Sequence, residues 1–523
     1  MFTPSLRYAL KVTLLLLLSA STCASTAAIP ALVSEGLAPE HTIINSDEEI
    51  WTASNGLTPN GQELLQAIKN LDLYGLSPNA FRKDLNQLTG AASGNEELEH
   101  QFNRVFERLS QALSQGQTSP TEQSEWSIKQ EAVSTDKLFS LLRNKAKLSE
   151  ILANLRPTSQ QHQQLLSALQ HYVSIQSNGG WRSLSNSDLV LNPGDRHPDI
   201  ARLRDRLRIE GDYQGQMQAD PLYFGPSLSL ALQQFQSRHG LINDGMLDLQ
   251  TRRTLRVPLA KRIEQLRVNL ERWRWLPREL GERYLLVNTA GGYADLIENN
   301  ARKLTVRTIA GRPYRATPSL SSKITRLVVN PSWGVPHRIA VEDLLPMQQN
   351  NNQFFTNKAI RVFSSKGTEL DTSTINWSAV SARNFPYRLR QDPGTDNSMG
   401  RIKFVFANEF DVYLHDTPNK ILFELPSRSF SSGCVRVEEP LLLAKSLIAE
   451  DSNALSVLED SSRSNNADTT NVGLINPVPI YLVYMTAWVD EKGLLHFTTD
   501  RYGRDPLIAQ ELQDNSQRTA ALP

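Results

Sequence analysis

Two short segments in the last quarter of the chain hold the residue types that nucleophilic catalysis requires. The first is Tyr413-Leu-His-Asp-Thr-Pro418, and the second is Ser429-Phe-Ser-Ser-Gly-Cys-Val-Arg436. A thiol attacks as its thiolate, so Cys434 needs a nearby base and donors for the oxyanion that its attack creates. His415 is the base that the spacing offers, because the 18 residues between His415 and Cys434 can form a loop that returns to the same face.

The residues around the cysteine predict the rest of such a site. Gly433 permits close backbone approach, so the main-chain N–H groups from Ser432 to Cys434 are candidates for an oxyanion hole. Arg436 has two interpretations of equal weight. It either binds a substrate carboxylate through two hydrogen bonds or braces the loop through a structural salt bridge. The group that orients the imidazole is either a backbone carbonyl near Asp416 or the Asp416 carboxylate, and Asp416 can also be a turn residue before Thr417-Pro418.

The first 28 residues have the order of a signal peptide. Arg7 and Lys11 precede an apolar run from Val12 to Leu18, which small residues follow up to Ala28. The run is shorter than the roughly 20 residues that span a bilayer, which argues against a membrane anchor. Cys23 suggests a lipoprotein, but the residues before it do not form a lipobox. Cleavage would leave Cys434 as the single cysteine, either a nucleophile or a buried inert thiol.

Composition bounds the remaining possibilities. The 523 residues, 40% of them hydrophobic, are enough for several domains, and equal counts of 55 basic and 55 acidic residues argue against a nucleic-acid partner. The nine histidines are scattered without metal-ligand spacing, so we expect no metal and no cofactor.

The pattern along the chain predicts a multidomain α+β protein. Residues 29–185 show leucines at helical spacing and predict an α-helical scaffold, and Leu259 to Trp275 predicts a linker helix within 259–280. Residues 281–490 are rich in β-branched and aromatic runs and predict a mostly-β domain. A long insertion at 334–387 is expected to act as a lid. The last residues, 491–523, are read as a C-terminal tail.

Two resemblances give these segments a function. Residues 186–258, with Phe235-Gln, Gly240-Leu241 and Asp244-Gly245, resemble the three-helix peptidoglycan-binding module, which serves either as a wall binder or as a spacer. The spacing from His415 to Ser431-Ser432-Gly433-Cys434 resembles the catalytic domain of the L,D-transpeptidases, in which most members have a second histidine where this chain has Ser432.

The transpeptidase resemblance implies a β-sandwich that acts on peptidoglycan tetrapeptide stems in the periplasm. It implies Cys434 as nucleophile, His415 as general base, formation of 3-3 cross-links between diaminopimelate residues, and sensitivity to carbapenems. It also suggests Asn397 and Tyr387 as donor-stem contacts, with a structural turn as an equal alternative, and other cell-wall synthases as partners. The open alternatives are attachment of a lipoprotein, L,D-carboxypeptidase activity, and a catalytically degenerate wall-binding scaffold.

Overall fold

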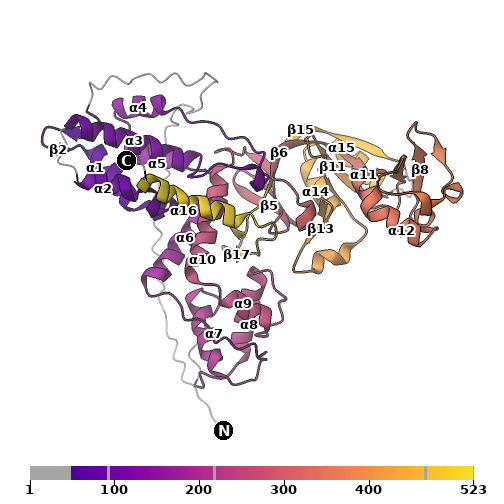
Figure 1. Ribbon diagram of the computed structural model, residues 1–523, viewed down its shortest axis with the longest axis horizontal. Helices are drawn as coiled ribbons and strands as arrows, with labels where there is room; N and C mark the ends of the chain where they lie inside the picture. The colour runs from indigo at the N-terminus through magenta and orange to yellow at the C-terminus, as the bar shows by residue number, and fades with distance from the viewer. Residues whose placement is uncertain (1–48, 91–94, 216–218, 464–467, 522–523) are drawn as a thin grey trace, which may run out of the picture.

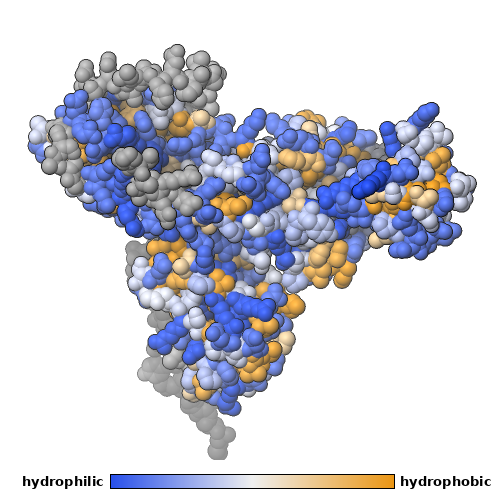
Figure 2. Space-filling view, in the orientation of Figure 1, coloured by the Kyte–Doolittle hydropathy of each residue, from blue (hydrophilic) through white to orange (hydrophobic). Residues whose placement is uncertain are grey.

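The protein is described by a computed structural model that covers residues 49–90, 95–215, 219–463 and 468–521. The segment predicted as a signal peptide lies outside these residues. Figure 1 shows a helical lobe at the left, a small helical lobe below it, a β-rich domain at the centre, and a further small lobe at the far right. The visible face is mainly hydrophilic, with separate apolar patches (Figure 2). Within the described residues, no helix is both long and apolar enough to cross a membrane.

The N-terminal lobe is a helical domain whose core is built from leucine and aromatic side chains at helical spacing. On its longest helix, Phe102, Phe106 and Leu109 are fully buried, and Trp51 packs against both phenylalanine rings. The helices of this lobe are α1 (Pro59–Lys69), α2 (Arg82–Gly90), α3 (Asn95–Ser114), α4 (Thr135–Arg143), α5 (Leu148–Asn154) and α6 (Gln160–Ser177), and a short hairpin joins β1 (Thr52–Ala53) to β2 (Gly56–Leu57).

The lower lobe consists of three short helices around a separate core that contains Leu203, Leu232 and Phe235. The helices are α7 (Pro198–Ile209), α8 (Pro226–Arg238) and α9 (Leu249–Leu255). Asp248 caps α9 by accepting a 2.7 Å hydrogen bond from the Thr251 N–H, which satisfies one of the unpaired donors at the helix start.

Helix α10 (Leu259–Arg274) joins the lobes. Its Leu266 and Leu270 lie in one apolar cluster with Leu165 and Leu169 of α6 and with Leu286 of the central sheet. The scaffold is therefore fixed to the outer face of the β domain by continuous apolar packing rather than by a flexible tether.

The central domain is one nine-stranded sheet that closes on itself. Its order is β13-β5-β14-β12-β11-β6-β15-β3-β4, and β4 also pairs with β5. The two layers of the expected sandwich are thus opposite halves of one curved sheet around an apolar core that includes Leu327, Phe404 and Leu414. The strands are β3 (Arg283–Asn288), β4 (Tyr293–Glu298), β5 (Ala301–Gly311), β6 (Leu320–Val329), β11 (Ile402–Phe406), β12 (Leu414–His415), β13 (Ser429–Ser431), β14 (Val435–Val437) and β15 (Thr470–Val483), and the helices α14 (Pro440–Leu447) and α15 (Ser452–Arg463) pack onto this core.

The insertion forms a subdomain with its own four-stranded sheet, in the order β7-β10-β8-β9. We call it the capping subdomain, residues 333–391, because its first and last strands extend slightly beyond the predicted 334–387. Phe355, Trp377 and Leu389 form part of a separate core there. Its elements are β7 (Trp333–Gly334), α11 (His337–Ile339), α12 (Leu345–Asn350), α13 (Phe354–Asn357), β8 (Ile360–Ser364), β9 (Glu369–Leu370) and β10 (Tyr387–Gln391).

The C-terminal residues differ from the predicted tail. Strand β17 (Leu495–Phe497) pairs with β16 (Ala487–Val489), and helix α16 (Asp505–Ala521) runs back along α10 toward the scaffold. The cause is apolar burial, because Ile508 and Leu512 of α16 pack in one cluster with Trp275. These two residues are four apart and therefore lie on one helical face.

Candidate active site

The pairing of β12 with β14 fixes which side chains share a face. The two strands are parallel, with Leu414 opposite Val435 and His415 opposite Arg436. Leu414 and Val435 are fully buried in the core of the sheet. Because side chains alternate along a strand, Tyr413, His415, Cys434 and Arg436 project from the other face as two adjacent pairs.

His415 is held in one tautomer by its own turn. The ring is buried, and Nδ1 donates to the backbone carbonyl of Asp416 at 2.5 Å. Nε2 is then the nitrogen that carries the lone pair and can accept a proton. Burial, reinforced by the positive charge of Arg436, lowers the pKa of His415 to about 3. The imidazole is therefore neutral at physiological pH, as a base must be.

The Asp416 carboxylate contacts the chain rather than the imidazole. It accepts from the Arg401 N–H at 2.8 Å and forms a 2.6 Å ion pair with Lys420. Gly400 lies against it with φ of 60°, and a Cβ at that position would come within 2.4 Å of the carboxylate. The orienting group of the histidine is thus the backbone carbonyl of Asp416, while its carboxylate holds the preceding loop in place.

The Cys434 thiol is half-buried and is flanked by donors and cations. Burial raises the pKa of Cys434, while a hydrogen bond from Tyr413 and the charges of Lys403 and Arg436 oppose that rise. Sγ lies 3.9 Å from the Asp411 carbonyl oxygen. Within the described residues no hydrogen bond joins it to His415. The resting site is therefore a neutral thiol beside a neutral imidazole, not a thiolate–imidazolium pair.

Tyr413 and Lys403 are two neighbours of the cysteine that sequence reasoning missed. Lys403 lies on β11 opposite His415, and its ammonium group sits 3.7 Å from the centre of the Tyr413 ring. The Tyr413 hydroxyl interacts with Cys434 and Trp333. The sequence predicts that Tyr413 and His415, two residues apart on one strand, lie on the same face. It does not predict that the strand of Lys403 pairs with that strand.

The loop before the cysteine is fixed by short hydrogen bonds. Ser431 Oγ donates to the Cys434 carbonyl at 2.5 Å and accepts from the Gly433 N–H at 3.1 Å, while Thr317 Oγ1 donates to the Gly433 carbonyl at 2.7 Å. Gly433 has φ of 124°, a conformation that favours glycine. Its N–H is thus already paired, whereas the N–H of Cys434 makes no hydrogen bond within the described part of the chain. The Cys434 N–H is the better-placed oxyanion donor of the two.

Ser432 connects the catalytic loop to the capping subdomain. Its Oγ accepts from Arg312 at 3.1 Å and from Arg315 at 2.8 Å. Arg315 in turn forms ion pairs with Asp343 at 2.5 Å and Glu342 at 2.6 Å, both in the capping subdomain. The Ser432 side chain is therefore an acceptor held by two arginines, which favours a positioning role over oxyanion donation by its hydroxyl.

Arg436 is half-buried next to Cys434, without a carboxylate partner among the described residues. Its Nε has no hydrogen-bond partner there. Burial and the nearby Arg312 lower the pKa of Arg436, while Cys434 raises it. A guanidinium with an unpaired donor next to the thiol favours substrate binding over a structural salt bridge.

The two more distant candidates have structural contacts. Asn397 is buried, and its amide donates to the carbonyls of Gln391 and Asp392 and accepts from the Met399 N–H. The Tyr387 ring packs against Trp377 and Phe385 in the core of the capping subdomain. Both sets of contacts favour the structural interpretation over contact with substrate.

Comparison with known proteins assigns these parts to families. The profile described as "L,D-transpeptidase catalytic domain" matches residues 282–451, which include both His415 and Cys434. The "Scaffold domain" profile matches residues 45–169, and the "Putative peptidoglycan binding domain" profile matches residues 196–255. The chain thus contains a catalytic domain of the L,D-transpeptidase family. In the same chain, this domain is joined to a scaffold domain and a peptidoglycan-binding domain.

Individual relatives carry the same family name. The chain is 35% identical over 209 residues to a Haemophilus influenzae protein named "Putative L,D-transpeptidase". The matched stretch is 39% of this chain and 41% of that protein. It is 13% identical to a solved L,D-transpeptidase from Stackebrandtia nassauensis, over 56% of this chain and 94% of that one, with a TM-score of 0.21. A solved L,D-transpeptidase from Mycobacterium smegmatis is 12% identical over 39% of this chain and 58% of that one, with a TM-score of 0.17.

Proposed function

We propose that this protein is a periplasmic L,D-transpeptidase that forms 3-3 cross-links between tetrapeptide stems of peptidoglycan, with Cys434 as nucleophile and His415 as general base. The observation that carries the proposal is the register of β12 and β14. It puts the only cysteine of the described residues on the same face as a neutral histidine whose Nδ1 is occupied by a backbone carbonyl. The location follows from the substrate and from the predicted signal peptide.

The first half of the reaction forms a thioester. Sγ of Cys434 attacks the carbonyl that links the L-centre of diaminopimelate to the terminal D-alanine, and the thiol proton passes to Nε2 of His415. The Cys434 N–H donates to the oxyanion. When the tetrahedral intermediate collapses, His415 returns the proton to the leaving amine, and D-alanine departs. A rotation of the cysteine side chain toward the imidazole is needed first, since catalytic hydrogen bonds often form only in the substrate complex.

The second half transfers the acyl group to an amine. The side-chain amine of a second stem's diaminopimelate attacks the thioester, His415 accepts a proton from that amine, and Cys434 leaves as the thiol. The half-buried guanidinium of Arg436 would bind a stem carboxylate beside the reacting carbonyl through its terminal NH2 groups. The capping subdomain, held to the catalytic loop by Arg315, would exclude water at this stage and so favour an amine acceptor.

Product analysis with purified protein and disaccharide-tetrapeptide tests the proposal. We expect release of D-alanine and formation of a 3-3 dimer, both abolished in Cys434→Ala and lowered by about 10²- to 10⁴-fold in His415→Ala. Release of D-alanine without dimer would indicate a carboxypeptidase. Transfer to a lysine-bearing peptide in place of a stem would indicate lipoprotein attachment. Equal dimer yield from wild-type protein and Cys434→Ala would refute the mechanism.

A further inference from the structure

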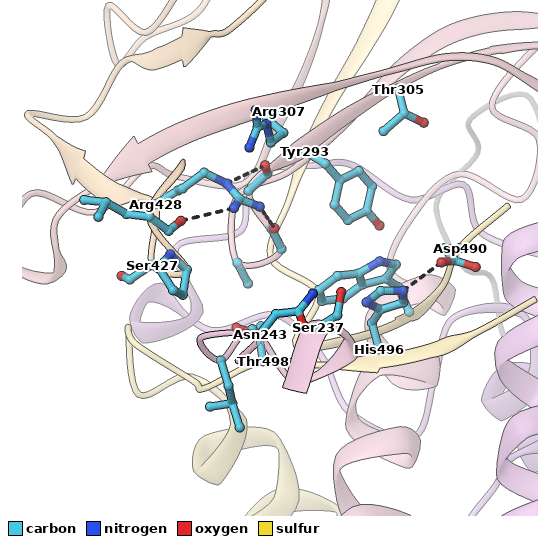
Figure 3. A pocket seen from close by; sticks show the side chains of 18 of the residues that line it. Ser237, Asn243, Tyr293, Thr305, Arg307, Ser427, Arg428, Asp490, His496 and Thr498 are labelled. Carbon is cyan, nitrogen blue, oxygen red and sulfur yellow. Dashed lines mark hydrogen bonds and ion pairs between the residues drawn. The ribbon is translucent and has the colours of Figure 1, made fainter. Parts of the chain in front are cut away.

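A cavity lies where the peptidoglycan-binding domain meets the catalytic domain. It has a volume of about 750 Å³, and its lining includes neither Cys434 nor His415. One side is formed by the end of α8 and the turn that follows it, with Ser237 and Asn243. Loop 424–428, strands β4 and β5, the turn between β3 and β4, and the β16–β17 hairpin with the residues that follow it line the rest. Figure 3 shows Ser237, Asn243 and His496 on one side and Arg307 and Arg428 on the other.

An aromatic wall forms part of the cavity. The Trp488 ring stacks on His496, with centroids 5.1 Å apart and planes 12° apart, and it lies 5.3 Å from the Tyr293 ring. Nε2 of His496 is 2.9 Å from an Asp490 oxygen, which fixes the imidazole (Figure 3). Three half-buried rings therefore present a rigid surface with polar edges, which suits a ligand that is both apolar and hydroxylated.

Several polar side chains at the rim of the cavity are not used by the fold. Ser237, Asn243 and Ser427 line it, and their side chains make no hydrogen bond with any part of the chain that the structure describes. They offer hydroxyl and amide groups, which both donate and accept. A ligand with hydroxyl and acetamido groups could pair with all three.

The charge of the lining favours an uncharged ligand. Its arginines and its carboxylates are equal in number, namely Arg302, Arg307, Arg428 and Arg501 against Asp295, Glu424, Asp490 and Glu491. Arg302 pairs with Asp295, Arg307 pairs with Glu424, and Arg428 donates to the carbonyls of Gly291, Gly292 and Leu425. Burial lowers the pKa of His496 despite the nearby Asp490, so this ring adds no positive charge at neutral pH. A stem peptide with several carboxylates would find little excess of cations here.

We propose that this cavity, lined by Ser237, Asn243 and the aromatic wall, binds the uncharged N-acetylated glycan of a peptidoglycan strand. The proposal rests on peptidoglycan being the substrate, as stated above. The volume falls within the roughly 300–1,000 Å³ of small-ligand sites. Arg428 in its wall lies six residues before Cys434, a stretch of chain that spans at most about 20 Å when fully extended. A glycan held here would therefore keep its stems close to the nucleophile.

Binding of chitotetraose, an uncharged N-acetylglucosamine oligomer, to the full-length protein tests the site. We expect saturable binding by calorimetry or by NMR titration, and weaker competition by glycan strands that an amidase has stripped of their stems, because each free lactyl group of these strands carries a carboxylate. Ser237→Trp should weaken binding at least tenfold, because an indole at this exposed position fills the cavity. Asn243→Ala should weaken it about two- to tenfold, the usual effect of one hydrogen bond. Ser167→Trp, at an exposed serine in the middle of α6, is the matched control and should bind as the wild type does.

The thermal unfolding midpoint of each variant shows whether the fold is kept. A wild-type protein that does not bind chitotetraose, or a folded Ser237→Trp variant that binds it unchanged, would overturn the glycan site. Tighter binding of a free stem tetrapeptide than of chitotetraose at this cavity would also overturn it. Because D-alanine release by the wild-type protein is measured separately, failure here is distinguishable from failure of the proposed transpeptidase activity.

Discussion

The protonation states of Cys434 and His415 lead to a distinctive pH dependence for alkylation of the thiol. Burial raises the pKa of Cys434 above its ordinary value of 9.0, and burial lowers the pKa of His415 to about 3. Below the pKa of the thiol, the thiolate fraction rises tenfold per pH unit and amounts to about 1% or less at pH 7. A thiolate–imidazolium pair would require the opposite order of the two pKa values and would give a constant thiolate fraction between them.

Alkylation with iodoacetamide, followed by intact-mass spectrometry of the mature protein, measures this fraction because the reagent reacts with the thiolate. From pH 6 to pH 9 we expect the rate constant to rise about tenfold per unit, without an inflection near 6.5. His415→Ala should change this rate by less than about threefold, yet it should slow acylation by a carbapenem by about 10²- to 10⁴-fold, since only acylation needs the base. A plateau in the alkylation rate between pH 5 and pH 8 would refute the neutral-pair account.

Three further predictions concern the groups around the thiol. Replacing residues 334–387 by a short linker should raise the ratio of hydrolysis to cross-linking in the product assay, and an unchanged ratio in a well-folded deletion would rule out a lid. Arg315→Met should lower the cross-linking rate about two- to fivefold, the range of a partly exposed ion pair, whereas Arg338→Met, which also loses a contact to Glu342 but is itself exposed, should not. Arg436→Lys should raise the KM for the tetrapeptide donor about tenfold with a smaller effect on kcat, because an ammonium group cannot form the bidentate contact. A KM equal to that of the wild-type protein would instead support the interpretation that Arg436 braces the loop.

The sequence was sufficient to predict the types of domain and their order. Periodic leucines, β-branched runs and turn residues are local signals, and the helical and β-rich parts follow from them, whereas the three-helix module was predicted from its resemblance to the peptidoglycan-binding module. The segment after residue 490 was the exception. Helix α16 has few apolar residues, and the reason it folds, burial of Ile508 and Leu512 against Trp275, depends on a helix more than 200 residues earlier.

The residues of the candidate site likewise divide into those that the sequence predicts and those that depend on strand pairing. Cys434 and His415 were predictable from their chemistry and spacing, and both remain a proposal for experiment. Tyr413 and Lys403 were not predictable, because their nearness to the thiol depends on the pairing of β11 with β12 and of β12 with β14. The contacts from Ser432 through Arg315 to Asp343 likewise join three distant parts of the chain, so no local sequence pattern predicts them.

The most direct test of the mechanism is to locate the acyl group that a carbapenem leaves on the protein. The strained lactam carbonyl resembles the scissile amide, so Cys434 should open the ring and keep one thioester per chain. Intact-mass spectrometry and peptide mapping should show a single adduct on Cys434 in the mature protein and none in Cys434→Ala. An adduct that persists in Cys434→Ala would place the nucleophile on another residue, and the absence of any adduct on the wild-type protein would favour a catalytically degenerate scaffold.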